Sequence, residues 1–113
     1  MKIEKIRSER TESTIVKACC DYLAAKRYFW WRQNNGGVYN VKKASFMKNP
    51  NTRKGVPDIF ALGRTKGSFI AIECKTSVGR QSPDQKNFEV SWGLTGGVYI
   101  LARSVDDLIK AGL

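Results

Sequence analysis

Two short apolar runs near the middle of the chain, residues 59–62 and 69–75, have the length and composition of β-strands. The polar link between them begins and ends near glycines, which suits a hairpin loop. Residues two apart share one face of a strand, so Glu73 and Lys75 project together, away from the apolar side chains of that strand. A hairpin would also bring Asp58, which precedes the first run, next to the strand that carries Glu73.

Residues 11–26 have the spacing of an amphipathic helix. Its apolar stripe is Ile15, Val16, Cys19 and Leu23. A helix turns by about 100° per residue, which places Glu12 inside this stripe. An acid on a buried face needs a partner or a metal ion, so we favour a functional role for Glu12. The alternative is an exposed acid in the first turn that complements the helix dipole.

Residues 28–33 read as a strand, and the Asn-Asn-Gly-Gly turn that follows predicts a hairpin with a returning strand over 38–41. The aromatic residues 29–31 are expected in the core rather than as base-stacking surfaces. The basic segment 42–54 contains an Asn-Pro-Asn breaker. It is either a mobile loop that contacts phosphate or a solvated loop.

The sequence Ser-Pro-Asp-Gln at residues 82–85 predicts the start of a helix, with Ser82 as the N-cap and Pro83 at the first position. Gln85 could return its amide to the Ser82 backbone, which would explain it structurally. Gln85 also shares a face with Phe88 and Trp92, so a role beside a functional site stays equally open.

Residues 97–102 predict a strand buried on both faces, and residues 104–112 a short capped helix. The predicted order is helix, hairpin-like strands, two further strands, helix, strand and helix. This order favours an α/β fold in which a mixed sheet is flanked by helices.

The length of 113 residues indicates a single domain spanning 1–113. Lys and Arg number 20 against 10 acids, a net charge of +10, which favours a polyanion such as nucleic acid over a merely solubilising charge. Between Asp21 and Asp58 there is no acid. The bases in that interval are Lys26, Arg27, Arg32, Lys42, Lys43, Lys48, Arg53 and Lys54.

The chain contains no histidine, which excludes histidine-based triads, metal sites and general acids. Any hydrolysis would depend on carboxylates, lysine and a metal ion bound by oxygen, for which Mg²⁺ is suited. The cysteines, Cys19, Cys20 and Cys74, form no CxxC pair and indicate a reducing compartment. No long apolar run or apolar signal core is present, so we expect a soluble intracellular protein without a membrane partner.

Three motifs in this order, Gly-Val-Pro-Asp58, Ile-Glu73-Cys-Lys75 and Ser-Pro-Asp-Gln85, resemble the PD-(D/E)XK nuclease superfamily. They are most similar to its virus-type replication-repair nuclease (VRR-NUC) branch, itself similar to archaeal Holliday junction resolvases. The resemblance runs roughly from Glu12 to Ala102. It implies a restriction-endonuclease-like core in the order α-β-β-β-α-β-α, in the cytoplasm of a bacterial or phage-infected cell.

The resemblance assigns catalysis to Asp58, Glu73 and Lys75, with Gln85 beside them. Asp58 and Glu73 would bind Mg²⁺, with Mn²⁺ as a substitute, and the main-chain carbonyl of Cys74 is a further expected ligand. Lys75 would hold the attacking water or the transition-state oxygen, or act as a base. Glu12 would join the metal site and could support a second ion. The alternative is a surface salt bridge between Glu73 and Lys75.

The expected activity is Mg²⁺-dependent, structure-specific cleavage of branched DNA, above all Holliday junctions, in repair or recombination. A homodimer is expected, since symmetric incision of two strands needs two sites and one chain carries one. Flap, nicking or restriction-type nucleases, a non-catalytic DNA-binding module and a basic RNA-binding protein are the alternatives. The predicted DNA-binding residues are Arg32, Lys42, Lys43, Lys48, Arg53, Lys54 and Arg80.

Overall fold

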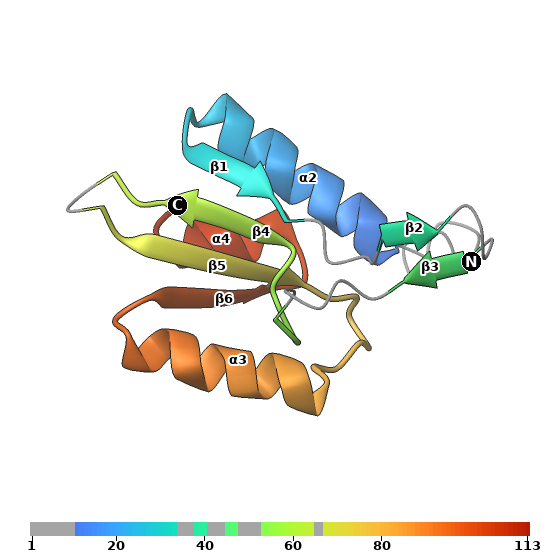
Figure 1. The fold of residues 1–113 in the computed structure, drawn as a ribbon. Helices are drawn as coiled ribbons and strands as arrows, with labels where there is room; N and C mark the ends of the chain where they lie inside the picture. Colours follow the sequence, from blue (N-terminus) through green and yellow to red (C-terminus); the bar gives the residue numbers. More distant parts are fainter. Residues whose placement is uncertain (1–10, 34–37, 41–44, 48–52, 65–66) are drawn as a thin grey trace.

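The computed structural model describes residues 11–33, 38–40, 45–47, 53–64 and 67–113. These residues form an α/β fold in which helices flank a four-stranded mixed sheet (Figure 1). The elements are α2 (Glu12–Ala25), β1 (Phe29–Arg32), β2 (Val38–Asn40), β3 (Ser45–Met47), β4 (Ile59–Leu62), β5 (Phe69–Cys74), α3 (Pro83–Leu94), β6 (Val98–Ala102) and α4 (Val105–Lys110). The predicted α/β class and mixed sheet are confirmed, whereas the predicted order matches in part.

The main sheet has the strand order β1-β4-β5-β6. Strand β4 pairs antiparallel with both β1 and β5, and β6 pairs parallel with β5. The hairpin predicted between β4 and β5 is confirmed, and the N–H of Gly63 donates to the carbonyl of Ser68 over 2.6 Å to close it. Helix α3 makes the crossover that two consecutive parallel strands require.

The predicted hairpin between residues 28–33 and 38–41 is wrong. Strand β1 pairs with β4, with Trp31 opposite Phe60, whereas β2 pairs with β3 in a separate two-stranded sheet. The turn sequence signalled a reversal, but the partner of β1 is set by the apolar face it shares with β4. The irregular segment expected over 42–54 is likewise interrupted by β3, and the predicted turn at 34–37 lies outside the described residues.

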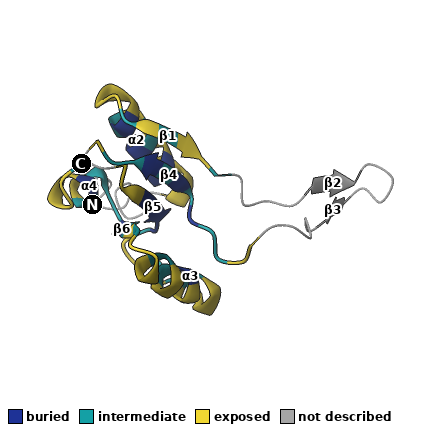
Figure 2. Cartoon of the chain, turned by 60° about the vertical axis from the view of Figure 1, so that its left-hand side comes forward, coloured by how far each residue is buried: buried dark blue, intermediate teal, exposed yellow. Residues whose placement is uncertain are grey.

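One face of the sheet packs on α2 and α4. The predicted apolar stripe of α2 is buried, and it contacts alternate residues of β4 and β5 such as Ile59 and Ile72. Figure 2 shows buried residues gathered on the central strands, whereas α3 is mostly exposed. Burial of these apolar side chains is the main favourable contribution to folding. No helix among the described residues is long and apolar enough to cross a membrane.

The other face of the sheet is covered only in part, by α3. Phe88 and Trp92 of α3 pack against Phe60, with ring centroids 6.5 Å and 5.4 Å apart. The expectation of a core position is wrong for Phe29 and Trp31, which are 71% and 42% exposed. The reason is that β1 is the end strand of the described sheet, and α3 lies over its opposite half (Figure 1).

Two smaller expectations also need correction. Strand β6 is not buried on both faces along its whole length, because Val98 at its start is 41% exposed. Helix α4 forms as predicted, but the Ser104 side chain makes no capping hydrogen bond. Instead, Asp107 in the first turn accepts a hydrogen bond from the backbone N–H of Arg103 over 2.8 Å.

Candidate metal centre

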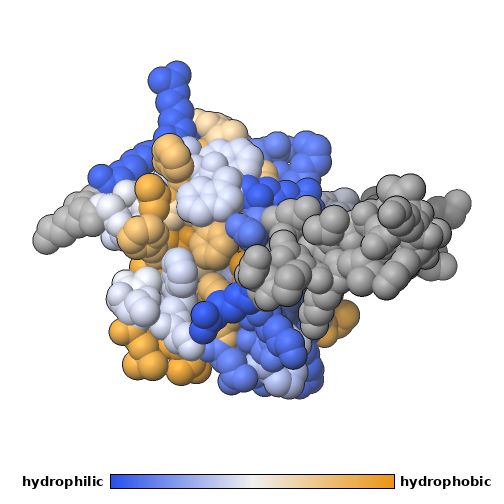
Figure 3. Space-filling model, in the orientation of Figure 1, coloured by the Kyte–Doolittle hydropathy of each residue, from blue (hydrophilic) through white to orange (hydrophobic). Residues whose placement is uncertain are grey.

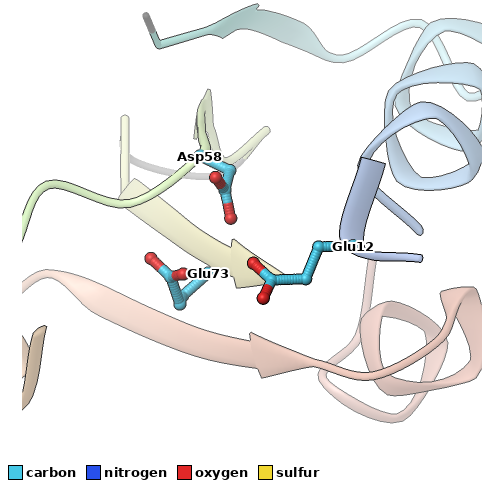
Figure 4. Close-up of side chains that lie close together, drawn as sticks. All are labelled: Glu12, Asp58 and Glu73. Carbon is cyan, nitrogen blue, oxygen red and sulfur yellow. The ribbon is translucent and has the colours of Figure 1, made fainter. Parts of the chain in front are cut away.

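Three carboxylates from separate elements converge at one end of the main sheet. Glu12 is the first residue of α2, Asp58 immediately precedes β4, and Glu73 lies near the end of β5. One oxygen from each carboxylate lies within 4.8 Å of those of the other two. Figure 4 shows the three side chains pointing toward a common space.

The pairing of β4 with β5 places Asp58 beside Glu73. The N–H of Asp58 continues the ladder by donating to the carbonyl of Ile72 over 3.1 Å. The side chain of Asp58 then accepts a hydrogen bond from the N–H of Cys74 at its Oδ2, over 2.8 Å. These two bonds fix the carboxylate of Asp58 against the backbone on both sides of Glu73.

Glu73 is 2% exposed, and one of its oxygens lacks a partner. Its Oε2 accepts a hydrogen bond from Nε2 of Gln85 over 3.0 Å and lies 3.8 Å from Nζ of Lys75. Its Oε1 is buried and has no hydrogen-bond partner among the described residues. A buried carboxylate oxygen without a partner is unfavourable, and a cation would relieve it.

Burial, followed by the negative charge of Asp58, raises the pKa of Glu73 to about 8, although the nearby Lys75 ammonium opposes the shift. The pocket therefore disfavours the charge of its own carboxylate when no cation is present. Such a combination of burial and like charges is typical of functional sites.

Glu12 combines the two alternatives that the sequence left open. It is exposed, and it stands in the first turn of a helix capped by Thr11, whose Oγ1 accepts from the N–H of Thr14 over 3.3 Å. Its carboxylate nevertheless belongs to the acid cluster. The expectation that Glu12 is on the buried stripe is wrong, because the burial of α2 begins one turn later, at Ile15.

The side chain of Lys75 lies beside the acid cluster, whereas that of Cys74 points away from it. Lys75 is 8% exposed, and its N–H continues the sheet by donating to Ala102 over 3.0 Å. The side chain of Cys74 faces the core, as expected, and its hydrogen bond with Cys19, together with burial, raises the pKa of its thiol. The Cys74 sulfur is therefore not a metal ligand, while its main-chain carbonyl stays a prediction.

Gln85 caps a helix and also contacts the acid cluster. Its Oε1 accepts from the N–H of Ser82 over 2.8 Å and its own N–H donates to Ser82 Oγ over 3.2 Å, which completes the capping box of α3. Its Nε2 donates to Glu73. Gly55 brings the segment before Asp58 against this helix start, because its φ is +73° and a Cβ there would collide with the Asp84 carbonyl.

Arg103 was not predicted to take part in the site. Its guanidinium donates to the carbonyl of Thr76 and, over 2.8 Å, to that of Gly79, so it holds the turn that follows Lys75. Arg103 directly follows an apolar run in the sequence. No local sequence pattern predicts that its partners are the backbone carbonyls of Thr76 and Gly79, far away in the chain.

The predicted DNA-binding residues fall into two groups. Arg32, Arg53, Lys54 and Arg80 are exposed. Arg32 is opposite Ile59 in the register, at the end of the sheet that carries Asp58. Lys42, Lys43 and Lys48 lie outside the described residues.

The donor set fits a hard divalent cation. Carboxylate oxygens from three elements, one of them buried and without a partner, are ligands that Mg²⁺ and Mn²⁺ prefer. The positive charge of the lysine beside them opposes that of the cation, and it can stabilise an anion bound next to the cation. The arrangement can therefore bring together a metal ion and a phosphate.

Comparisons of the chain with models of protein families, with curated proteins and with solved structures found no match.

Proposed function

We propose that this chain is a Mg²⁺-dependent nuclease of the PD-(D/E)XK superfamily that hydrolyses phosphodiester bonds in DNA. The observation that carries the proposal is the buried, unpartnered Oε1 of Glu73 inside a cluster completed by Asp58 and Glu12. The alternative, a surface salt bridge between Glu73 and Lys75, does not explain these features. Both side chains are buried, and their charged atoms are 3.8 Å apart.

Asp58, Glu73 and Glu12 would hold the metal ion in this proposal. When bound, Mg²⁺ supplies Lewis acidity, which lowers the pKa of a water molecule and stabilises charge on phosphate oxygens. Gln85 fixes the orientation of the Glu73 carboxylate through its hydrogen bond.

Lys75 supplies a positive charge next to the position of a phosphate. Its side chain is only 10% exposed, so its charge is poorly screened by solvent. The ammonium group would attract the non-bridging oxygens most strongly when negative charge builds up on them in the transition state. Arg103 stabilises the turn after Lys75 and so acts as a positioning residue.

The finer substrate assignment rests on the resemblance of the motifs to VRR-NUC nucleases. It favours branched DNA, with Holliday junctions as the first candidate, cut by a homodimer with one site per chain. The exposed cations Arg32, Arg53, Lys54 and Arg80 would neutralise backbone phosphates without reading sequence.

The direct test is cleavage of end-labelled four-way junction, flap, nicked and linear DNA with Mg²⁺, Mn²⁺, Ca²⁺ or EDTA. We expect cutting with Mg²⁺ and Mn²⁺ only. Asp58→Asn and Lys75→Ala should each reduce the rate at least about 100-fold while leaving DNA binding intact. Asp106→Asn, which removes an exposed acid from the first turn of α4, is the matched control and should cut normally.

The alternative function is a DNA-binding module without catalysis. It would be supported if the wild-type chain binds DNA but no metal ion yields any cleavage product. Light scattering addresses the expected homodimer separately, since a monomer at micromolar concentration would favour a flap or nicking nuclease.

A further inference from the structure

Exposed aromatic residues lie on the same face of the sheet as the acid cluster. In the register of the sheet, Trp31 is opposite Phe60, and the next residues along β1 and β4 on that face are Gln33 and Asp58. Residues two apart along a strand are separated by about 7 Å. Trp31 therefore belongs to the row of side chains adjacent to the acids.

Trp31 is exposed, but contacts with neighbouring side chains orient its ring. Its ring stacks on Phe60 with a centroid distance of 5.6 Å and an interplanar angle of 29°. Its Nε1 donates a hydrogen bond to Oε1 of Gln33 over 3.3 Å. The N–H of Gln33 in turn donates to the carbonyl of Asp58 over 2.8 Å, which links the position of the ring to the acid cluster.

The exposed aromatic surface extends from Trp31 along the sheet. Phe29 meets Trp31 edge to face at 6.4 Å, and Phe69, on the same face, is 59% exposed. Figure 3 shows apolar and pale side chains crossing this face between β1 and α3, bordered by hydrophilic ones. We call Phe29, Trp31 and Phe69 the aromatic track.

Exposed cations lie beside α3, the helix that packs on this face of the sheet. Arg53 and Lys54 are exposed and line a hollow of about 250 Å³ against α3, together with Asp84, Asn87, Phe88 and Ser91. At the opposite end of β1, Arg64 lies over the ring of Tyr28, 4.2 Å from its centroid, and Tyr28 packs against the core on the other face of the sheet. Exposed aromatic rings and the exposed cations Arg53 and Lys54 therefore occur on the face of the sheet that α3 covers in part.

The positive charge of the chain favours a nucleic acid over a second copy of the chain as the ligand of this surface. The chain carries a net charge of +10, which a polyanion complements and a second copy of the chain does not. A single-stranded nucleic acid offers negative phosphates for the cations and flat base surfaces for the aromatic rings. Bases inside a duplex are already stacked on each other, so only unpaired nucleotides can use the track.

We propose that Trp31, supported by Phe29, is a base-stacking platform for unpaired nucleotides adjacent to the bond that is cut. The inference rests on the proposed nuclease function and narrows its substrate to DNA with a single-stranded segment at the scissile site. Substrates with such a segment are flaps, gaps, bubbles and frayed junctions.

The test compares Trp31→Ala and Trp31→Phe with wild type, using Ile109→Ala as a control that trims an exposed apolar residue on α4. Affinity is measured in Ca²⁺, so it does not depend on cleavage. For a flap oligonucleotide we expect about tenfold weaker binding for Trp31→Ala, and near wild-type binding for Trp31→Phe and Ile109→Ala. Binding of a fully paired duplex should change less than twofold.

Tryptophan fluorescence gives a second readout, which reports directly on contact between bases and the indole rings. The flap oligonucleotide should quench wild-type emission, and the quenching should be largely lost in Trp31→Ala, although Trp30 and Trp92 remain. Equal effects on flap and duplex, or no effect on either, would overturn the proposal. So would a loss of dimer mass in light scattering with unchanged nucleic-acid binding, since the track would then be a subunit contact.

The experiments distinguish failure of the stacking platform from failure of the proposed nuclease function. If the wild type binds flaps in a Trp31-dependent way but never cuts with any metal ion, the nuclease assignment fails and the stacking platform stands. If it cuts paired and flapped DNA equally and Trp31→Ala cuts both at the wild-type rate, the platform fails and the nuclease stands.

Discussion

Gln85 binds Glu73 and caps helix α3 with the same amide group. Its Nε2 donates to Oε2 of Glu73 over 3.0 Å, while its Oε1 accepts from the N–H of Ser82 over 2.8 Å. The start of α3 and the orientation of the central acid are therefore coupled. A substitution at Gln85 should affect both stability and the metal centre, whereas one at Ser82 should affect stability alone.

Ser82→Ala and Gln85→Ala separate these two roles. Each removes one hydrogen bond of the capping box and should lower the free energy of unfolding by about 1 kcal/mol. Only Gln85→Ala also leaves Oε2 of Glu73 without its amide donor. We expect cleavage to fall about tenfold in Gln85→Ala and less than threefold in Ser82→Ala. Urea unfolding and single-turnover cleavage measure the two effects, and equal rates in the two variants would exclude the coupling.

The stability of the metal-free protein should fall as the pH rises from about 5 to about 9. The pKa of Glu73 is about 8 in the folded protein against 4.5 for the ordinary carboxyl, so the folded state holds a proton that the unfolded state has lost. Stability that depends on this proton is fully present below pH 4.5 and is lost as the pH passes through about 8. Asp58, Glu12 and Lys75 are the charged groups that face Glu73.

Urea unfolding in EDTA across this pH range measures how the free energy of unfolding depends on the ionisation of Glu73. Glu73→Gln, which cannot ionise, should show a flatter profile between pH 5 and 9 than the wild type. Excess Mg²⁺ should also flatten the wild-type profile, because a bound cation favours the ionised carboxylate. Identical profiles for wild type and Glu73→Gln in EDTA would show that Glu73 is not the group responsible.

Glu12→Gln should make the metal-free protein more stable and should lower its affinity for the metal ion. The charge of Glu12 contributes to the raised pKa of Glu73, so removing it relieves repulsion within the cluster. The same substitution removes an anionic ligand for the cation. Thermal unfolding in EDTA should show a small rise in Tm, and calorimetric titration should show weaker Mg²⁺ and Mn²⁺ binding. Asp106→Asn serves as control, and a lower Tm with unchanged metal affinity would contradict the assignment of Glu12.

Gly55→Ala should destabilise the protein more than Gly67→Ala. Both glycines have positive φ, +73° and +60°, so alanine should cost about 1 kcal/mol at either position through backbone strain. At Gly55 the added Cβ also collides with the Asp84 backbone, whereas at Gly67 it would meet no atom within 4 Å among the described residues that are not its chain neighbours. We expect a loss at Gly55 larger by at least about 1 kcal/mol, measured by urea unfolding. Equal losses would mean that the segment before Asp58 does not pack closely on α3.

The proximity of the acids could be predicted because it follows from short-range geometry. The period of two places Glu73 on the opposite face to Ile72, and the tight link between β4 and β5 brings Asp58 alongside. Helical periodicity placed Glu12 toward the sheet but wrongly on the buried stripe, and its exposure matches the alternative interpretation. Each of these inferences needed only the chain within one or two elements.

The neighbours of β1 could not be predicted in this way. Local turn chemistry indicated a hairpin after residue 33, but strand pairing depends on which distant apolar surface is available, and β4 offered a better match. The exposure of Phe29 and Trp31 follows from that pairing and from the position of α3. Arg103 was missed for the same reason, because its acceptors are backbone carbonyls that any residue type could provide.

The order of the elements has a consequence for synthesis. Glu12 leaves the ribosome early, Glu73 and Gln85 come much later, and the parallel partner of β5 is made only after α3. A nascent chain therefore cannot assemble the acid pocket until Glu73, α3 and β6 have all been made. Under the proposed function, a chain that stops before α3 would lack the amide that orients Glu73, so cleavage activity would appear only after that helix has been made.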